Sequence, residues 1–197
     1  MRYGAAGRLL LTPVDKEGPQ RAGRLLRLGL GRRPEAAFDL FADRLADVTG
    51  APCAMVNFID EHRQFFAGLH TPAGGHRGGH RRTRPRAAAD AVADSAIGRS
   101  MARDHGYCPH VVARRRALVL DDVRDYPRFA GNPVVDEIGI RSYLGAPLLD
   151  DRTGLALGTV CVVDTAPRAW GRSGLATIKE MAGELMDLVR GREGPGG

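Results

Sequence analysis

The chain has 197 residues, of which 43% are hydrophobic, and a formal net charge of +6. This length suits one domain with a buried core, and no apolar run approaches the ~20 residues of a membrane span. Three widely spaced cysteines form neither a disulfide framework nor a CxxC metal motif, which favours a reducing, cytoplasmic compartment.

The excess positive charge lies at the N-terminus. Residues 1–33 contain eight Arg and Lys residues against two acidic ones, so the remaining chain is electrically balanced. Nearly all basic residues are Arg, which together with abundant Gly and Ala indicates a compositional bias, and no nucleic-acid-binding motif accompanies them. We expect no nucleic-acid partner and a flexible tail over residues 1–33. Four leucines leave the alternative of an amphipathic docking or membrane-surface arm: Leu25, Leu26, Leu28 and Leu30.

A helix and a hairpin are predicted after this tail. Pro34 suits the first turn of the helix, and Gly50 ends it. One face of this helix is apolar through Phe38, Phe41, Leu45 and Val48. Strands are then predicted over Cys53–Ile59 and residues 62–69, joined by a turn at residues 60–61.

The middle of the chain is irregular. Residues 71–93 are a low-complexity stretch of Gly, His, Arg and Ala, and they predict a long, mobile surface loop. A short helix follows at residues 107–112, with Pro109 in its first turn. The strand Leu118–Leu120 then leads into a polar connection over residues 124–140.

The last elements are two strands and a helix. Strands are predicted over residues 143–149 and 157–163, and a helix over residues 173–190. The apolar stripe of this helix is formed by Leu175, Ile178, Ala182, Leu185 and Val189. Residues 191–197 are expected to be a disordered tail. Strands between terminal helices indicate an α+β fold with an antiparallel sheet, and no segment has the pattern of a dinucleotide-binding or P-loop unit.

Six segments occur in a characteristic order: FDLFADRL (residues 38–45), VTGAP (48–52), VNFIDEHRQFF (56–66), DYPRFAGNP (125–133), RSYLGAP (141–147) and LGTVCVVD (157–164). Together they resemble a GAF domain, the small-molecule sensor module of signalling proteins. The resemblance covers residues 34–190 and implies one domain with a twisted antiparallel sheet. It places terminal helices on one face, and a ligand pocket under loops and a short helix on the other.

The resemblance also implies a function. We expect a stand-alone bacterial sensor or regulator without catalytic activity, which acts in trans through a protein partner such as a sensor kinase or regulator. GAF domains often dimerise through their terminal helices, and Met181, Met186 and Leu188 widen the apolar stripe of the last helix. A homodimer through these helices is therefore expected.

The pocket candidates come from the hairpin, the short helix, the connection and the following strand: Phe58, Phe66, Tyr107, Cys108, His110, Phe129, Arg141 and Tyr143. Aromatic side chains provide apolar walls, and Arg141 or His110 could orient an anion. Core packing is the alternative role for each of them. The sequence does not name the ligand.

Cys108 adds an alternative function, because a thiol at a helix start can be reactive and can serve as a redox switch or enzyme nucleophile. Specialised GAF activities find little support. Pro109 stands where bilin-binding GAF domains have His after Cys, residues 124–140 lack the catalytic Cys of GAF-type methionine sulfoxide reductases, and residues 164–174 lack the cyclic-nucleotide pattern.

Two further alternatives concern metals and partners. His105, Cys108 and His110 could be metal ligands, but at a helix start positions 108 and 110 point away from each other, whereas zinc needs three or four converging ligands. We therefore expect neither a metal nor haem. A pure interaction module with a vestigial pocket is also possible, in which the basic N-terminal segment would dock to the partner.

Overall fold

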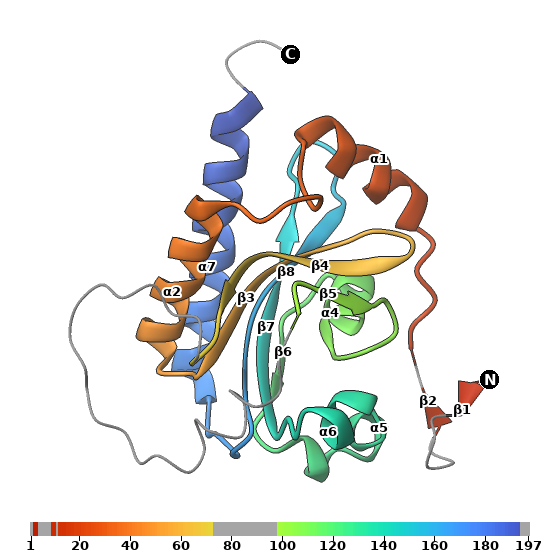
Figure 1. The fold of residues 1–197 in the computed structure, drawn as a ribbon, viewed down its shortest axis with the longest axis vertical. Coiled ribbons are helices and arrows are strands. Elements are labelled where there is room, and N and C mark those ends of the chain that lie inside the picture. The colour runs from red at the N-terminus through yellow and green to blue at the C-terminus, as the bar shows by residue number, and fades with distance from the viewer. Residues whose placement is uncertain (1, 4–8, 11, 73–97, 194–197) are drawn as a thin grey trace.

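The computed structural model describes residues 2–3, 9–10, 12–72 and 98–193. Six strands form one antiparallel sheet in the order β5-β4-β3-β8-β7-β6 (Figure 1). The bounds are β3 (Cys53–Ile59), β4 (Arg63–His70), β5 (Ser100–Ala102), β6 (Leu118–Leu120), β7 (Ser142–Leu149) and β8 (Ala156–Asp164). Two short strands, β1 (Arg2–Tyr3) and β2 (Leu9–Leu10), pair with each other. The predicted α+β class with an antiparallel sheet is confirmed.

Helices cover both faces of the six-stranded sheet. Their bounds are α1 (Gly18–Leu28), α2 (Ala36–Thr49), α4 (Cys108–Arg114), α5 (Pro127–Ala130), α6 (Pro133–Glu137) and α7 (Gly171–Arg190). Figure 1 shows α2 and α7 side by side on one side of the sheet, with α4, α5 and α6 on the other. None of the helices in the described ranges is long and apolar enough to cross a membrane.

The two central strands, β3 and β8, are buried along their whole length. Because successive side chains point to opposite faces, each strand supplies two separate cores. The helix-side core lies under α1, α2 and α7 and includes Val56, Phe58 and Leu144. The second core lies on the opposite face of the sheet, under α4, α5 and α6, and includes Met55 and Cys161.

Helix α2 lies very close to β4 at Gly68. A Cβ atom at Gly68 would lie 2.2 Å from the backbone oxygen of Phe38, so only glycine allows this approach. Three of the four predicted stripe residues are buried here: Phe38, Phe41 and Leu45. Val48, the fourth residue of the predicted apolar face, is 58% exposed and does not join the core.

Helix α7 buries the predicted stripe residues Ile178, Leu185 and Val189 in the helix-side core. Met181 and Met186 also pack inward, whereas Leu188 is 53% exposed. Of the three residues expected to widen the stripe, Leu188 is the one that remains available to a partner.

The N-terminal segment differs from the expected flexible tail. Helix α1 buries Leu25, and Leu30 follows it into the same core, so these two leucines are not free for a membrane or docking arm. The buried face of α1 also carries Arg21, which is 0% exposed and donates from Nε to the carbonyl oxygen of Ile59 at 2.7 Å. Arg24 pairs with Asp150 at 2.8 Å.

The irregular middle of the chain contains more structure than expected. The polar connection holds the short helices α5 and α6 and a 3₁₀ turn at Val123–Asp125, and β5 extends the sheet. A second 3₁₀ turn, Gly191–Glu193, continues α7. Most of the predicted loop at 71–93, and the tail at 194–197, lie outside the described residues.

The buried side chain of Arg21 on α1 is expected to contribute to the stability of the folded chain. Replacing Arg21 by Ala leaves the Asp15 carboxylate without this partner and empties a fully buried site, so Arg21→Ala should lower the free energy of unfolding in urea by about 3 kcal/mol. Arg27→Ala, on the exposed face of the same helix, is the matched control and should unfold like the wild type. Equal stability of the Arg21 variant and the wild type would show that α1 is not docked.

Candidate functional site

A small cavity of about 40 Å³ lies between the sheet and its α4–α6 cover. The sheet side is formed by Met55, Gln64, Phe66, Met101, Tyr143, Cys161 and Val163. The cover side is formed by Gly106, Tyr107, Cys108, Val134, Ile138 and Ile140. A space of this size holds no more than about three water molecules.

Two cysteine sulfurs face each other beside the cavity. Cys108 is the first residue of α4, Cys161 lies on β8, and their Sγ atoms are 3.6 Å apart. The hydroxyl of Tyr143 on β7 lies 3.4 Å from the Cys108 sulfur. Gly145 makes room for this hydroxyl, because a Cβ there would lie 2.2 Å from it. All three cysteines of the chain are free thiols and buried.

The cysteines differ in acidity. Hydrogen bonding with Cys161, helped by Tyr143, lowers the pKa of Cys108 to about 6 despite its burial. The same contact with Cys108, together with burial, raises the pKa of Cys161 well above its usual value. Burial raises the pKa of Cys53 to about 12. The pair at the cavity therefore holds one acidic thiol and one that keeps its proton.

Gln64 connects the sheet with the cover. Its side-chain nitrogen donates to the backbone oxygens of Ala102 at 2.9 Å and His105 at 2.6 Å, and its oxygen accepts from Asn57 at 2.9 Å. The Asn57 Oδ1 atom and the hydroxyls of Tyr107 and Thr159 are buried and have no hydrogen-bond partner within the described part of the chain. Unpaired buried polar atoms are costly, so this region has unused capacity for a polar ligand group.

Asn132 joins two segments of the cover. Its Oδ1 atom accepts from the Gly106 nitrogen and its Nδ2 atom donates to the Gly106 oxygen, both at 2.9 Å. Gly106 has φ +72°, a left-handed conformation that favours glycine. Asn132 also caps α6 through the nitrogen of Val134. One side chain thus fixes the position of the cover over the cavity.

His110 and Phe129 form a second layer behind the cavity. The His110 ring stands edge-on to Phe129, with centroids 5.0 Å apart, and Phe129 packs in turn against Tyr107 at 5.8 Å. Burial, with the nearby charges of Arg128 and Arg114, lowers the pKa of His110 to about 4. The ring is therefore neutral at physiological pH.

The structure brings together four of the eight predicted pocket residues: Phe66, Tyr107, Cys108 and Tyr143. His110 and Phe129 lie one layer behind. Phe58 faces the helix-side core, where its ring packs against Phe38 at 5.7 Å, so it does not line this cavity. Arg141 is held by Asp122, with Nε to Oδ1 at 2.9 Å, and does not orient an anion in the cavity.

Sequence reasoning missed several lining residues. Met55 could have been found by alternation along β3, because it shares a face with Cys53 and not with Phe58. Cys161 and Val163 face the same side of β8. Ile138 and Ile140 gave no such signal, since they lie in irregular segments of the cover.

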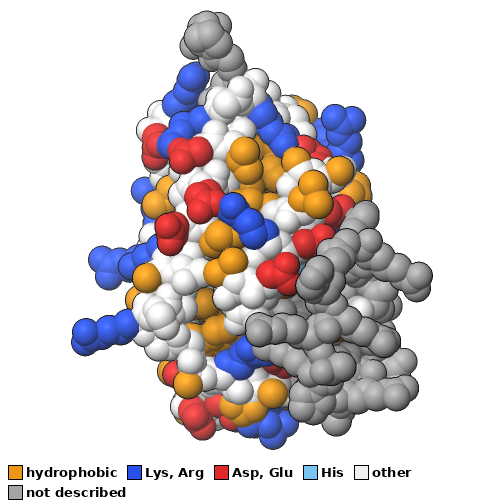
Figure 2. Space-filling model, turned by 90° about the vertical axis from the view of Figure 1, so that its left-hand side faces the viewer, with side chains coloured by type: hydrophobic (Ala, Val, Ile, Leu, Met, Phe, Trp, Pro, Cys, Tyr) orange, Lys and Arg blue, Asp and Glu red, His pale blue; other side chains and the backbone are white. Residues whose placement is uncertain are grey.

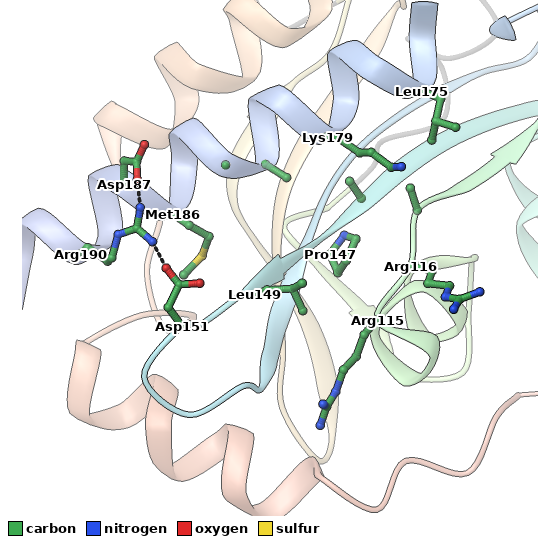
Figure 3. A pocket seen from close by; sticks show the side chains of 14 residues that line it. Arg115, Arg116, Pro147, Leu149, Asp151, Leu175, Lys179, Met186, Asp187 and Arg190 are labelled. Carbon is green, nitrogen blue, oxygen red and sulfur yellow. Dashed lines mark hydrogen bonds and ion pairs between the residues drawn. The ribbon is translucent and has the colours of Figure 1, made fainter. Parts of the chain in front are cut away.

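A larger groove of about 800 Å³ lies on the other side of the sheet, between α7, the outer edge of β7 and the segment that follows α4. Figure 3 shows Pro147, Leu149 and Met186 along its floor. At one end, Arg190 pairs with Asp151 and Asp187, as the dashed lines in Figure 3 mark. At the other end, the cationic side chains of Lys179 and Arg116 border the groove.

Metal binding finds no support in the described ranges, where no three His, Cys, Asp or Glu side chains converge on a point that could hold an ion. His105 pairs with Asp104 and Glu137 instead of facing Cys108.

Comparison with known proteins shows which family this chain belongs to. The model of the GAF domain family matches residues 33–186. A cyclic di-GMP phosphodiesterase of Pseudomonas aeruginosa is 30% identical over 146 residues, which cover 71% of this chain. The match spans only 20% of that protein's length, so most of that protein has no counterpart here.

Solved structures show the same fold at low sequence identity. A free methionine-R-sulfoxide reductase of Neisseria meningitidis is 14% identical, with a TM-score of 0.56 and coverage of 94% of this chain and 98% of that one. A far-red cyanobacteriochrome photoreceptor is 12% identical, with a TM-score of 0.56 and coverage of 89% and 94%. One is an enzyme and the other a photoreceptor, so the fold alone does not decide between catalysis and sensing.

The neutral His110 predicts a pH dependence of stability. The unfolded chain takes up a proton on His110 as the pH falls through about 6.5, whereas the folded chain resists it down to about 4. Stability should therefore be complete above pH 6.5 and fall by up to about 3 kcal/mol toward pH 4. Urea unfolding of His110→Phe should lack this part of the loss.

His62→Phe is the matched control, because His62 is exposed, and it should keep the wild-type pH dependence. The assignment fails if wild type and His110→Phe lose stability equally over this pH range.

Proposed function

Since the chain belongs to the GAF domain family, we propose that it is a non-catalytic regulatory domain that binds a small molecule in the cavity under the α4–α6 cover and signals in trans. The observation that carries this proposal is that α4 and β7 each reach both the cavity and the groove. Cys108 at the start of α4 lines the cavity, and Arg115 and Arg116 just after its end line the groove. On β7, Tyr143 lines the cavity and Pro147 lines the groove.

This arrangement gives a physical route for a signal. A ligand that displaces α4 changes the groove at the other end of the same short helix, because a helix moves largely as a rigid unit. The groove combines an apolar floor with cationic and acidic side chains at its ends, which suits a protein partner. We propose a partner of the sensor-kinase or regulator class.

The cavity lining points to an uncharged ligand. Apart from the Cys108 thiol, none of the residues that line the cavity in the described structure is ionisable near neutral pH, none is cationic, and most are apolar. A carboxylate or phosphate would lose its hydration without gaining a cationic partner. The Tyr107 hydroxyl, buried and without a partner in the described ranges, is available to hydrogen-bond one polar group of a mainly apolar compound.

Ligand entry requires the cover to move outward, because the present cavity is smaller than any such compound. The segments of the cover are joined by the Asn132–Gly106 pair of hydrogen bonds, and Gln64 of the sheet donates to the backbone oxygen of His105 just before them. These few polar contacts can open without breaking the strand pairing of β3 and β8.

A second copy of the chain is the other proposed partner. Leu40 and Val48 on α2 and Leu188 on α7 are exposed, at 64%, 58% and 53%. Figure 2 shows hydrophobic side chains among charged ones on the side of the molecule that carries these helices. We propose that they form a homodimer seam. The three free thiols fit a cytoplasmic location.

The ligand proposal can be tested with a neutral probe and its charged analogue. Indole should raise the melting temperature of the protein and bind at least about tenfold more tightly than indole-3-acetate, because the carboxylate would be buried without a cation. Titration calorimetry measures both affinities.

Two variants make this test specific. Ile138→Trp should fill the cavity and abolish indole binding, whereas Val14→Trp, at a site that is 83% exposed, should bind indole like the wild type. Equal binding of the two probes, or unchanged binding by the Ile138 variant, would place the probe elsewhere and refute the proposal.

The dimer proposal has its own test. Leu188→Glu should convert a dimer into a monomer in light scattering coupled to size exclusion, because it buries a charge in an apolar seam. Leu26→Glu, at an exposed position of α1, should leave the dimer intact. A wild-type chain that is monomeric at high micromolar concentration would contradict the seam.

A further inference from the structure

We propose that Cys108 and Cys161 form a peroxide-reactive dithiol that closes to an internal disulfide and so ties α4 to β8. This goes beyond the proposed ligand binding and does not depend on it. The oxidant class is a small hydroperoxide, with hydrogen peroxide as the simplest member.

The two sulfur atoms lie close enough for a disulfide bond to form after a small movement. They come from elements far apart in the sequence and lie 3.6 Å apart, so a shift of about 1.6 Å reaches the bond length of about 2.05 Å. Both sulfurs line the 40 Å³ cavity, which is large enough for a molecule only slightly bigger than water. The reactive atoms and the space for the oxidant thus coincide.

Cys108 is the attacking residue and Cys161 the resolving one. Hydrogen bonding between the two thiols lowers the pKa of Cys108 and raises the pKa of Cys161, so Cys108 is the thiol that loses its proton first. The Tyr143 hydroxyl at 3.4 Å can donate a hydrogen bond to the Cys108 thiolate. Cys53 is buried, and its pKa is raised to about 12, so this thiol keeps its proton and is not expected to react.

The chemistry balances in two steps. The Cys108 thiolate attacks one peroxide oxygen, the O–O bond breaks, and the released hydroxide takes up the proton that Cys108 had given to water, leaving a sulfenic acid and one water. The Cys161 sulfur then attacks the Cys108 sulfur, the S–O bond breaks, and the hydroxide leaves with the Cys161 proton as a second water. Two thiols are oxidised by two electrons, and one peroxide is reduced to two waters. A dithiol reductant reverses the reaction.

The disulfide would act on α4, the helix that lies between the cavity and the groove. It draws the first turn of α4 toward the sheet, and Arg115 and Arg116 at the groove follow directly after the same helix. The oxidation state of the pair is thereby coupled to the shape of the groove.

The test is oxidation of the full-length native protein by hydrogen peroxide, followed by alkylation of free thiols and intact-mass and peptide analysis without reductant. We expect the loss of two of the three alkylatable thiols, a Cys108–Cys161 cross-linked peptide, and full reversal by dithiothreitol. Circular dichroism before and after oxidation confirms that the chain remains folded.

Variants assign the roles. Cys161→Ser should accumulate a Cys108 sulfenic acid that dimedone traps, Cys108→Ser should form neither product, and the matched control Cys53→Ser should form the disulfide at the wild-type rate. The proposal is overturned if the folded wild type keeps three free thiols, if Cys53 enters the disulfide, if the cross-link joins two chains, or if it forms only in urea.

Discussion

The pairing of β3 with β8 at the centre of the sheet is the constraint on which the rest of the structure depends. Both strands are buried on both faces, so each of them must have apolar or paired side chains on either side. The helix-side face is filled by the long helices α2 and α7. The opposite face is closed by short helices and connecting segments in the described structure, and these leave a cavity against the sheet.

The sequence predicted five of the six strands of the sheet and the helices α2 and α7, because their apolar patterns are local. Gly50 ends α2 and β3 begins and ends where expected. Helix α1 escaped notice because its buried face carries Arg21 and Arg24, which read as solvated charges in the sequence. Asp150, the acidic partner of Arg24, is distant in sequence. In the sequence, arginines that are buried and paired look the same as arginines in a solvated basic tail. Only the structure shows which carboxylates neutralise them.

The candidate site was predicted only in part, because some of its contacts join residues that are distant in sequence. Family resemblance pointed to Tyr107, Cys108 and Tyr143, and these do meet at the cavity. Phe58 and Phe66 could not both belong to it, because Phe58 pairs in register with Phe65 and therefore points to the other face. The contact of Cys108 with Cys161 spans 53 residues and depends on how α4 packs on β8, which no local pattern encodes.

We propose that the cavity and the groove are coupled through α4. Hydrogen–deuterium exchange of the native chain with and without indole tests it most directly, because it reports each segment separately. We predict altered amide exchange in residues 127–137, where the cover opens, together with residues 108–117, which reach the groove, while α2 stays unchanged. If indole changes amide exchange in other segments but not in residues 108–117, the cavity and the groove are not coupled through α4.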